Sequence, residues 1–128
     1  MNRDPILVVD DNPDNLKLTE LLLKREGYGV RTAEDAEQTL ALLQTYRPRL
    51  ILMDIQLPGM DGLELTRRLR DMPGLAGTPI VALTAYAMPG DEANARNAGC
   101  TGYITKPINT RSFGGLIRRY LEPSAEPR

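Results

Sequence analysis

Short runs of apolar, largely β-branched residues alternate along the chain with amphipathic stretches, and this alternation repeats five times. The apolar runs cover residues 6–9, 29–32, 50–53, 79–83 and 102–105. Strand-length apolar runs that alternate with helical patterns are typical of a parallel β-sheet covered by helices. The chain is therefore predicted to be an α/β protein.

The composition of each run predicts its place in the sheet. Runs 6–9, 50–53 and 79–83 are continuously apolar. Such runs are expected where helices cover both faces of a sheet, so these three strands should be central. Run 29–32 contains Arg31 and is predicted to lie at an edge.

The amphipathic stretches carry apolar residues at helical spacing. The first is predicted to start with Asn12 as N-cap and Pro13 as first helical residue, and it places Leu18, Leu21 and Leu22 on one face. A fourth stretch, about 89–98, has only alanines as its apolar residues. The remaining apolar stripes are Ala36, Leu40 and Leu43, then Leu65, Leu69 and Met72, and finally Phe113, Leu116, Ile117 and Tyr120.

Composition excludes several kinds of chemistry. The 128 residues include no His and one Cys, Cys100, so Ser-His or Cys-His catalysis, a thiolate zinc site and an intrachain disulfide are excluded. The formal net charge is −1, with 16 basic and 17 acidic residues, which gives no basic surface for direct nucleic-acid binding. No apolar run is long enough to insert into a membrane, and residues 1–5 do not resemble a signal peptide, so we expect a cytoplasmic protein.

Polar residues follow four of the five predicted strands. Asp10 and Asp11 follow the first, Asp54 the third, Thr84 the fourth and Lys106 the fifth. The carboxyl ends of parallel strands meet at one edge, so these side chains should lie close together. Alone, each aspartate is equally consistent with a helix cap or a turn. Together, three repelling carboxylates need a cation, and oxygen ligands without His or Cys indicate Mg²⁺. A metal ion beside an ammonium and a hydroxyl group can receive a phosphoryl group.

Four segments resemble the receiver domains of bacterial two-component response regulators. They are ILVVDDN at 6–12, LILMDIQLPGMDG at 50–62, IVALTA at 80–85 and AGCTGYITKP at 98–107. The resemblance implies a doubly wound (βα)₅, flavodoxin-like three-layer sandwich whose parallel sheet has the strand order 2-1-3-4-5. It extends to about residue 121, so the receiver domain is expected at 1–121. Residues 122–128 contain two prolines and no apolar periodicity, and a disordered tail is expected there.

The resemblance also implies site roles. Asp54 would be the phosphorylated residue, and Mg²⁺ would be held by Asp11, Asp54 and the backbone carbonyl of Gln56, with Asp10 acting largely through a bound water. Thr84 and Lys106 would contact the phosphoryl oxygens. The peptide bond between Lys106 and Pro107 would be cis.

Switching is implied at two positions. Thr84 would turn toward the phosphoryl group, and Tyr103 would then turn inward, which changes the surface formed by the fourth helix, fifth strand and fifth helix. A Tyr103 on an edge strand with its hydroxyl in water is the alternative. Gln56 and Tyr86 occupy the two positions that tune the lifetime of the phosphorylated state.

The resemblance is greatest to stand-alone cell-cycle-type regulators and to receivers of hybrid histidine kinases. A single-domain response regulator in a phosphorelay would have a histidine kinase or histidine phosphotransfer protein and a downstream effector as partners, and would be a monomer or a weak phosphorylation-dependent dimer. An excised receiver of a hybrid kinase is the alternative. A Mg²⁺-dependent phosphohydrolase is disfavoured because Gln56 stands where such enzymes have an acid/base carboxylate. A phosphorylation-independent scaffold is disfavoured because all the acidic residues, the threonine and the lysine of the family site are present.

Overall fold

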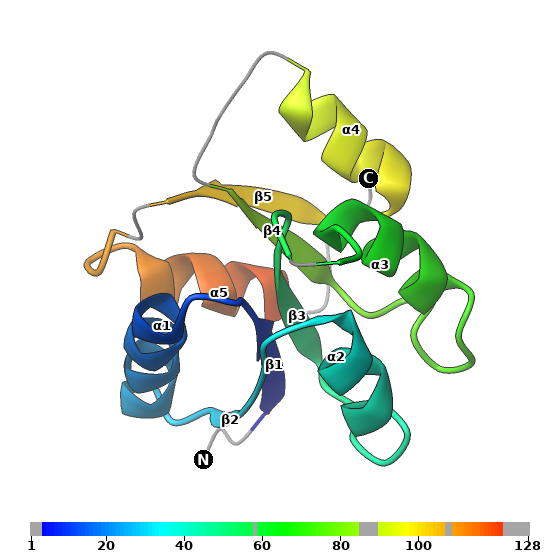
Figure 1. Ribbon diagram of the computed structural model, residues 1–128. Helices are drawn as coiled ribbons and strands as arrows, with labels where there is room; N and C mark the ends of the chain where they lie inside the picture. The colour runs from blue at the N-terminus through cyan, green and yellow to red at the C-terminus, as the bar shows by residue number, and fades with distance from the viewer. Residues whose placement is uncertain (1–3, 58, 85–89, 107–108, 122–128) are drawn as a thin grey trace.

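The computed structural model describes residues 4–57, 59–84, 90–106 and 109–121, in which strands and helices alternate as predicted (Figure 1). No helix in these ranges is long and apolar enough to cross a membrane. Each predicted strand agrees with the observed one to within one residue at either end. The strands are β1 (Pro5–Val9), β2 (Gly29–Ala33), β3 (Leu50–Asp54), β4 (Ile80–Thr84) and β5 (Gly102–Thr105), and the helices are α1 (Pro13–Arg25), α2 (Ala36–Leu42), α3 (Gly62–Arg70), α4 (Asp91–Ala98) and α5 (Phe113–Leu121).

The five strands form one parallel sheet in the order β2-β1-β3-β4-β5. This order confirms the predicted topology, with β1, β3 and β4 in the centre and β2 at an edge. The order in which successive strands are added to the sheet reverses between β1 and β3, and ligands bind at this place in doubly wound folds. The carboxyl ends of β1 and β3 therefore lie side by side.

Alternate residues of the central strands face two separate cores. Leu7, Ile51 and Ala82 pack with α2, α3 and α4 on one face of the sheet. Val8 and Leu52 pack with α1 and α5 on the other face. Figure 1 shows α1 and α5 together on one side of the sheet, which completes the predicted three layers. Burial of both strand faces is the reason for the continuous apolar runs.

Helix α1 begins as predicted, but of its predicted apolar face only Leu22 is buried. The Asn12 side chain accepts hydrogen bonds from the backbone amides of residues 14 and 15, and Pro13 is the first helical residue. Leu18 and Leu21 are 38% and 56% exposed, whereas Leu16 and Leu23 are buried together with Thr19 and Leu22. The helix has apolar residues at helical spacing in two phases, and contact with the sheet selects the phase that includes Leu16 and Leu23.

Candidate functional site

The polar residues singled out in the sequence converge at the carboxyl edge of the sheet. Asp54 and Thr84 are the last residues of β3 and β4, and Asp10 and Lys106 directly follow β1 and β5. Hydrogen bonds continue the ladder there, because the Asp10 amide donates to Ala33 O at 3.1 Å and the Lys106 amide donates to Thr84 O at 2.6 Å. The site is therefore built on strand ends held by the rigid sheet.

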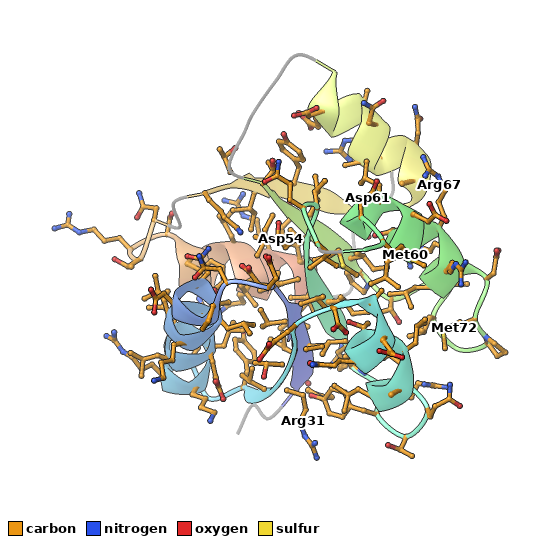
Figure 2. All side chains as sticks on the ribbon, in the orientation of Figure 1. Arg31, Asp54, Met60, Asp61, Arg67 and Met72 are labelled. Carbon is orange, nitrogen blue, oxygen red and sulfur yellow. The ribbon has the colours of Figure 1, made fainter. Side chains whose placement is uncertain are left out.

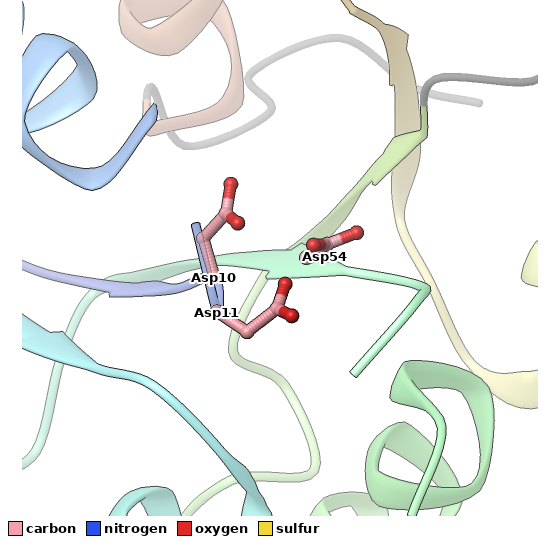
Figure 3. Close-up of side chains that lie close together, drawn as sticks. All are labelled: Asp10, Asp11 and Asp54. Atoms are coloured by element: carbon pink, nitrogen blue, oxygen red, sulfur yellow. The ribbon is translucent and has the colours of Figure 1, made fainter. Parts of the chain in front are cut away.

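Three carboxylates form the centre of the site (Figure 3). Asp10, Asp11 and Asp54 each offer an oxygen atom, and these oxygens lie within 4.8 Å of one another. Asp10 and Asp54 are buried, whereas Asp11 is exposed. The backbone amide of Asn12 donates to Asp10 Oδ1 at 2.9 Å, and that of Gln56 donates to Asp54 Oδ1 at 3.0 Å. One oxygen of each buried carboxylate is thus held by a backbone amide, and the other lies near the ammonium group of Lys106.

Lys106 supplies a positive charge to this cluster. Its Nζ lies 3.1 Å from Asp10 Oδ2 and 3.4 Å from Asp54 Oδ2, and its side chain is only 14% exposed. Asp10 Oδ2 is buried and has this ion pair but no hydrogen bond of regular geometry among the described residues. One ammonium group cannot neutralise three carboxylates, so the cluster retains excess negative charge.

Burial and the neighbouring charged groups change the pKa of Asp54. Burial raises the pKa of its carboxyl group to about 6, and the negative charge of Asp10 acts in the same direction. The Gln56 amide and the Lys106 ammonium favour the ionised form and oppose this rise in the pKa. Asp54 is therefore a carboxylate at neutral pH, although at an energetic cost.

These residues fit a hard divalent cation. Their donors are carboxylate oxygens, which Mg²⁺ prefers, and the exposed Asp11 leaves room for the waters that Mg²⁺ retains. The buried Asp10 Oδ2 is an oxygen that a cation would satisfy. Beside such an ion, the Asp54 carboxylate is a nucleophile at a point where positive groups can stabilise a phosphoryl group.

Thr84 and Tyr103 lie on the adjacent strands β4 and β5, where Tyr103 pairs with Ala82, two residues before Thr84. Thr84 is buried, and the Tyr103 hydroxyl is also shielded from solvent. Burial raises the pKa of Tyr103, and the neighbouring Thr84 hydroxyl acts in the opposite direction, although the hydroxyl of Tyr103 makes no hydrogen bond of regular geometry among the described residues. A Tyr103 hydroxyl in water, the alternative considered from the sequence, is therefore wrong.

The other predicted positions are only partly visible. Gln56 is exposed and contributes its backbone amide to Asp54. Tyr86, Pro107 and the predicted tail at 122–128 lie outside the described residues. The sequence did not indicate that Gly62, the first residue of α3, lies directly against the backbone of Asp54. Figure 2 labels Asp54 and Asp61, the residue before Gly62. The position of Gly62 after a capping aspartate was the available signal.

Comparisons with known proteins agree with this geometry. The family model described as response regulator receiver domain matches residues 6–118. The polar-differentiation response regulator DivK of Brucella anthropi is 43% identical over 116 residues, which cover 91% of this chain and 94% of that protein.

Solved structures show the same arrangement. The chemotaxis response regulator CheY4 of Vibrio cholerae is 30% identical, with a TM-score of 0.88 over 94% of this chain and all of that one. The receiver domain of a sensor histidine kinase from Pseudomonas aeruginosa is 35% identical, with a TM-score of 0.85 over 94% of this chain and 98% of that one. Its structure contains a magnesium ion coordinated in the active-site cleft.

Proposed function

The chain belongs to the response regulator receiver domain family, and on this premise we propose that Asp54 accepts a phosphoryl group from a phosphohistidine on a histidine kinase or a histidine phosphotransfer protein. The observation that carries the proposal is the position of the Asp54 carboxylate. It ends the central strand β3, within 3.4 Å of Lys106 and within the acidic cluster. Receiver domains are signalling domains, and phosphorylation is how this chain would receive its signal.

The transfer is a displacement at phosphorus. An Asp54 carboxylate oxygen forms a bond to phosphorus while the bond from phosphorus to the donor histidine nitrogen breaks, and that nitrogen keeps the electron pair. Asp54 must be ionised to attack, which its pKa of about 6 permits at neutral pH. Lys106 would move from its two carboxylate partners to a phosphoryl oxygen, and the Thr84 hydroxyl would donate to another.

The same residues would bind the cofactor. Asp11, Asp54 and the backbone carbonyl of Gln56 would hold Mg²⁺, and Asp10 would act largely through a bound water. When bound, Mg²⁺ neutralises charge that develops on the phosphoryl oxygens. The retained negative charge of the cluster and the magnesium ion in the similar Pseudomonas receiver support this assignment.

Phosphorylation would change a surface rather than produce a product. A phosphoryl group on Asp54 would draw the Thr84 hydroxyl toward it, and Tyr103 would follow into the space that is released. The nearness of the buried Thr84 side chain to the shielded hydroxyl of Tyr103 supports the coupling. The surface of α4, β5 and α5 would then bind a different set of partners, and Gln56 and Tyr86 would set how long the state lasts.

A single-domain regulator is the form that the relatives favour, because this chain covers 94% of the length of the Brucella protein. Residues 1–121 would form the receiver. Its partners would be a kinase or phosphotransfer protein and a downstream effector, and it would act as a monomer or a weak phosphorylation-dependent dimer. The receiver of a hybrid histidine kinase is the second candidate, favoured by the 35% identity to the Pseudomonas domain. Substrate turnover is disfavoured, because the Gln56 side chain cannot exchange a proton as a carboxylic acid does.

Phosphorylation by a small donor tests the proposal directly. The protein is incubated with acetyl phosphate and Mg²⁺, and its intact mass is measured beside that of an Asp54→Asn variant. We expect the wild type to gain one phosphoryl group, and EDTA or the substitution to abolish the gain. A gain that persists in Asp54→Asn would overturn the assignment of Asp54. If acetyl phosphate gives no gain, transfer from a phosphorylated histidine kinase decides the question.

A further inference from the structure

The first residue of α3 leaves no room for a side chain beside the phosphorylatable strand end. A Cβ atom placed on Gly62 would lie 2.2 Å from the carbonyl oxygen of Asp54, 3.0 Å from its carbonyl carbon and 2.8 Å from Cα of Ile55. All three are backbone atoms, which cannot rotate away as the end of a side chain can. Gly62 does not have a positive φ, so the requirement for glycine here is one of space and not of backbone conformation.

Hydrogen bonds of Ile55 to Gly62 and to Leu83 fix the backbone where α3 contacts the end of β3. The Gly62 amide donates to Ile55 O at 2.7 Å, and the Ile55 amide donates to Leu83 O at 3.1 Å. The residue after Asp54 is thus fixed between the end of β4 and the start of α3. The next amide, that of Gln56, donates to Asp54 Oδ1 at 3.0 Å and so sets the direction of the carboxylate.

From these contacts we infer that Gly62 is a positioning residue for phosphorylation. By letting α3 begin against the backbone of Asp54, it fixes the short segment that orients both the Asp54 carboxylate and the Gln56 carbonyl. This inference rests on the proposed role of Asp54. Displacement of reacting groups by about 1 Å can slow a reaction about 100-fold, so the atoms that set this distance contribute to the rate.

The Gly62→Ala variant tests the inference, and Gly115→Ala is its matched control. Gly115 is also helical, and a Cβ atom there would meet nothing within 4 Å. Circular dichroism establishes folding. Three readouts then follow: the phosphorylation rate at saturating acetyl phosphate, the Mg²⁺ affinity by calorimetry, and amide exchange of Gln56 in EDTA.

We expect the folded Gly62→Ala protein to be phosphorylated at least about tenfold more slowly, to bind Mg²⁺ more weakly and to exchange the Gln56 amide faster. Gly115→Ala should stay within twofold of the wild type in all three. Wild-type rate and wild-type Gln56 exchange in folded Gly62→Ala would overturn the inference, even if that variant were less stable. If wild-type protein fails to be phosphorylated, the exchange of Gln56 still tests the positioning, which separates the two proposals.

A second pair of variants covers the case in which Gly62→Ala does not fold. Asp61 caps α3 by accepting from the Glu64 amide at 2.9 Å, and Asp35 caps α2 by accepting from the Gln38 amide at 2.7 Å. Alanine at either position removes one comparable cap and adds no atoms. Asp61→Ala should slow phosphorylation and speed Gln56 exchange, and Asp35→Ala should do neither. Equal effects of the two substitutions would contradict a positioning role for the start of α3.

Discussion

The buried carboxyl group of Asp54 makes the stability of the metal-free protein depend on pH. Burial raises its pKa from 3.8 to about 6. Below both values the group is protonated in the folded and the unfolded chain, but as the pH rises above them the folded chain must hold a poorly solvated charge. For an acid whose pKa is raised by folding, stability is therefore lost as the pH rises through about 6. The neutral Asp54→Asn variant should escape this loss.

The size of the effect follows from the two pKa values. A change from 3.8 to about 6 corresponds to about 3 kcal/mol of unfolding free energy at pH 8 and to less than about 1 kcal/mol at pH 4. With a typical urea dependence of about 2 kcal/mol per molar, Asp54→Asn should raise the unfolding midpoint at pH 8 by about 1.5 M. Addition of Mg²⁺ should reduce this difference, because a cation stabilises the wild-type cluster more than the variant.

Urea unfolding followed by circular dichroism in EDTA at pH 4, 6 and 8 measures the difference. Asp71→Asn is the matched control, because Asp71 is exposed and its substitution removes the same charge. We expect the stabilisation by Asp54→Asn to grow with pH, while Asp71→Asn stays within about 0.5 kcal/mol of the wild type throughout. An equal gain in stability from Asp54→Asn at all three pH values would refute the reasoning. A wild type that is more stable than Asp54→Asn at pH 8 would refute it as well.

Three further substitutions probe other parts of the structure. Lys106→Met should destabilise the metal-free protein by at least about 1 kcal/mol at pH 8 and less at pH 5, where protonation of Asp54 removes the charge of one of the two carboxylates, Asp10 and Asp54, that lose their ion pair; urea titrations at the two pH values check this. Arg70 donates hydrogen bonds to four backbone carbonyls, three in the segment before β4 in the chain and one, that of Gly99, after it. Arg70→Lys should therefore lower the unfolding free energy by about 2 kcal/mol and accelerate amide exchange at the end of α4. Unchanged exchange there would contradict this expectation. Leu23→Ala should lower the unfolding free energy by about 2–5 kcal/mol, and Leu21→Ala should lower it by less than about 0.5 kcal/mol. Equal losses of stability in thermal unfolding would mean that the buried face of α1 is misplaced.

The fold was largely predictable because its main signals are local. Continuous apolar runs marked β1, β3 and β4 as central, and the polar Arg31 marked β2 as an edge, since burial on both faces leaves no place for polar side chains. The cap Asn12 was equally visible, because a cap accepts hydrogen bonds from amides two or three residues away. The strand order 2-1-3-4-5 could not be predicted from periodicity. It was predicted from the resemblance of four segments to receiver domains.

The site was predicted as a set of residues rather than as a geometry. Asp10, Asp54, Thr84 and Lys106 were found because strand ends of a parallel sheet share one edge, which is a property of the topology. The division of Lys106 between two carboxylates, the burial of Asp10 and the raised pKa of Asp54 depend on distances of a few ångströms between different strands. No spacing along the chain contains those distances.

By itself, then, the sequence determined the alternation of strands and helices, the central strands and the residues that meet at the site, because hydrophobic periodicity and the polar residues that follow each apolar run are local features of the chain. Tertiary structure alone decided which of two apolar phases of α1 is buried and why residue 62 is a glycine. Both depend on which surface another element presents at that point. Leu18 and Leu21 satisfy helical spacing as well as Leu16 and Leu23 do, and only packing on the sheet separates them. The missing side chain of Gly62 acquires its meaning only where α3 meets the carbonyl group of Asp54.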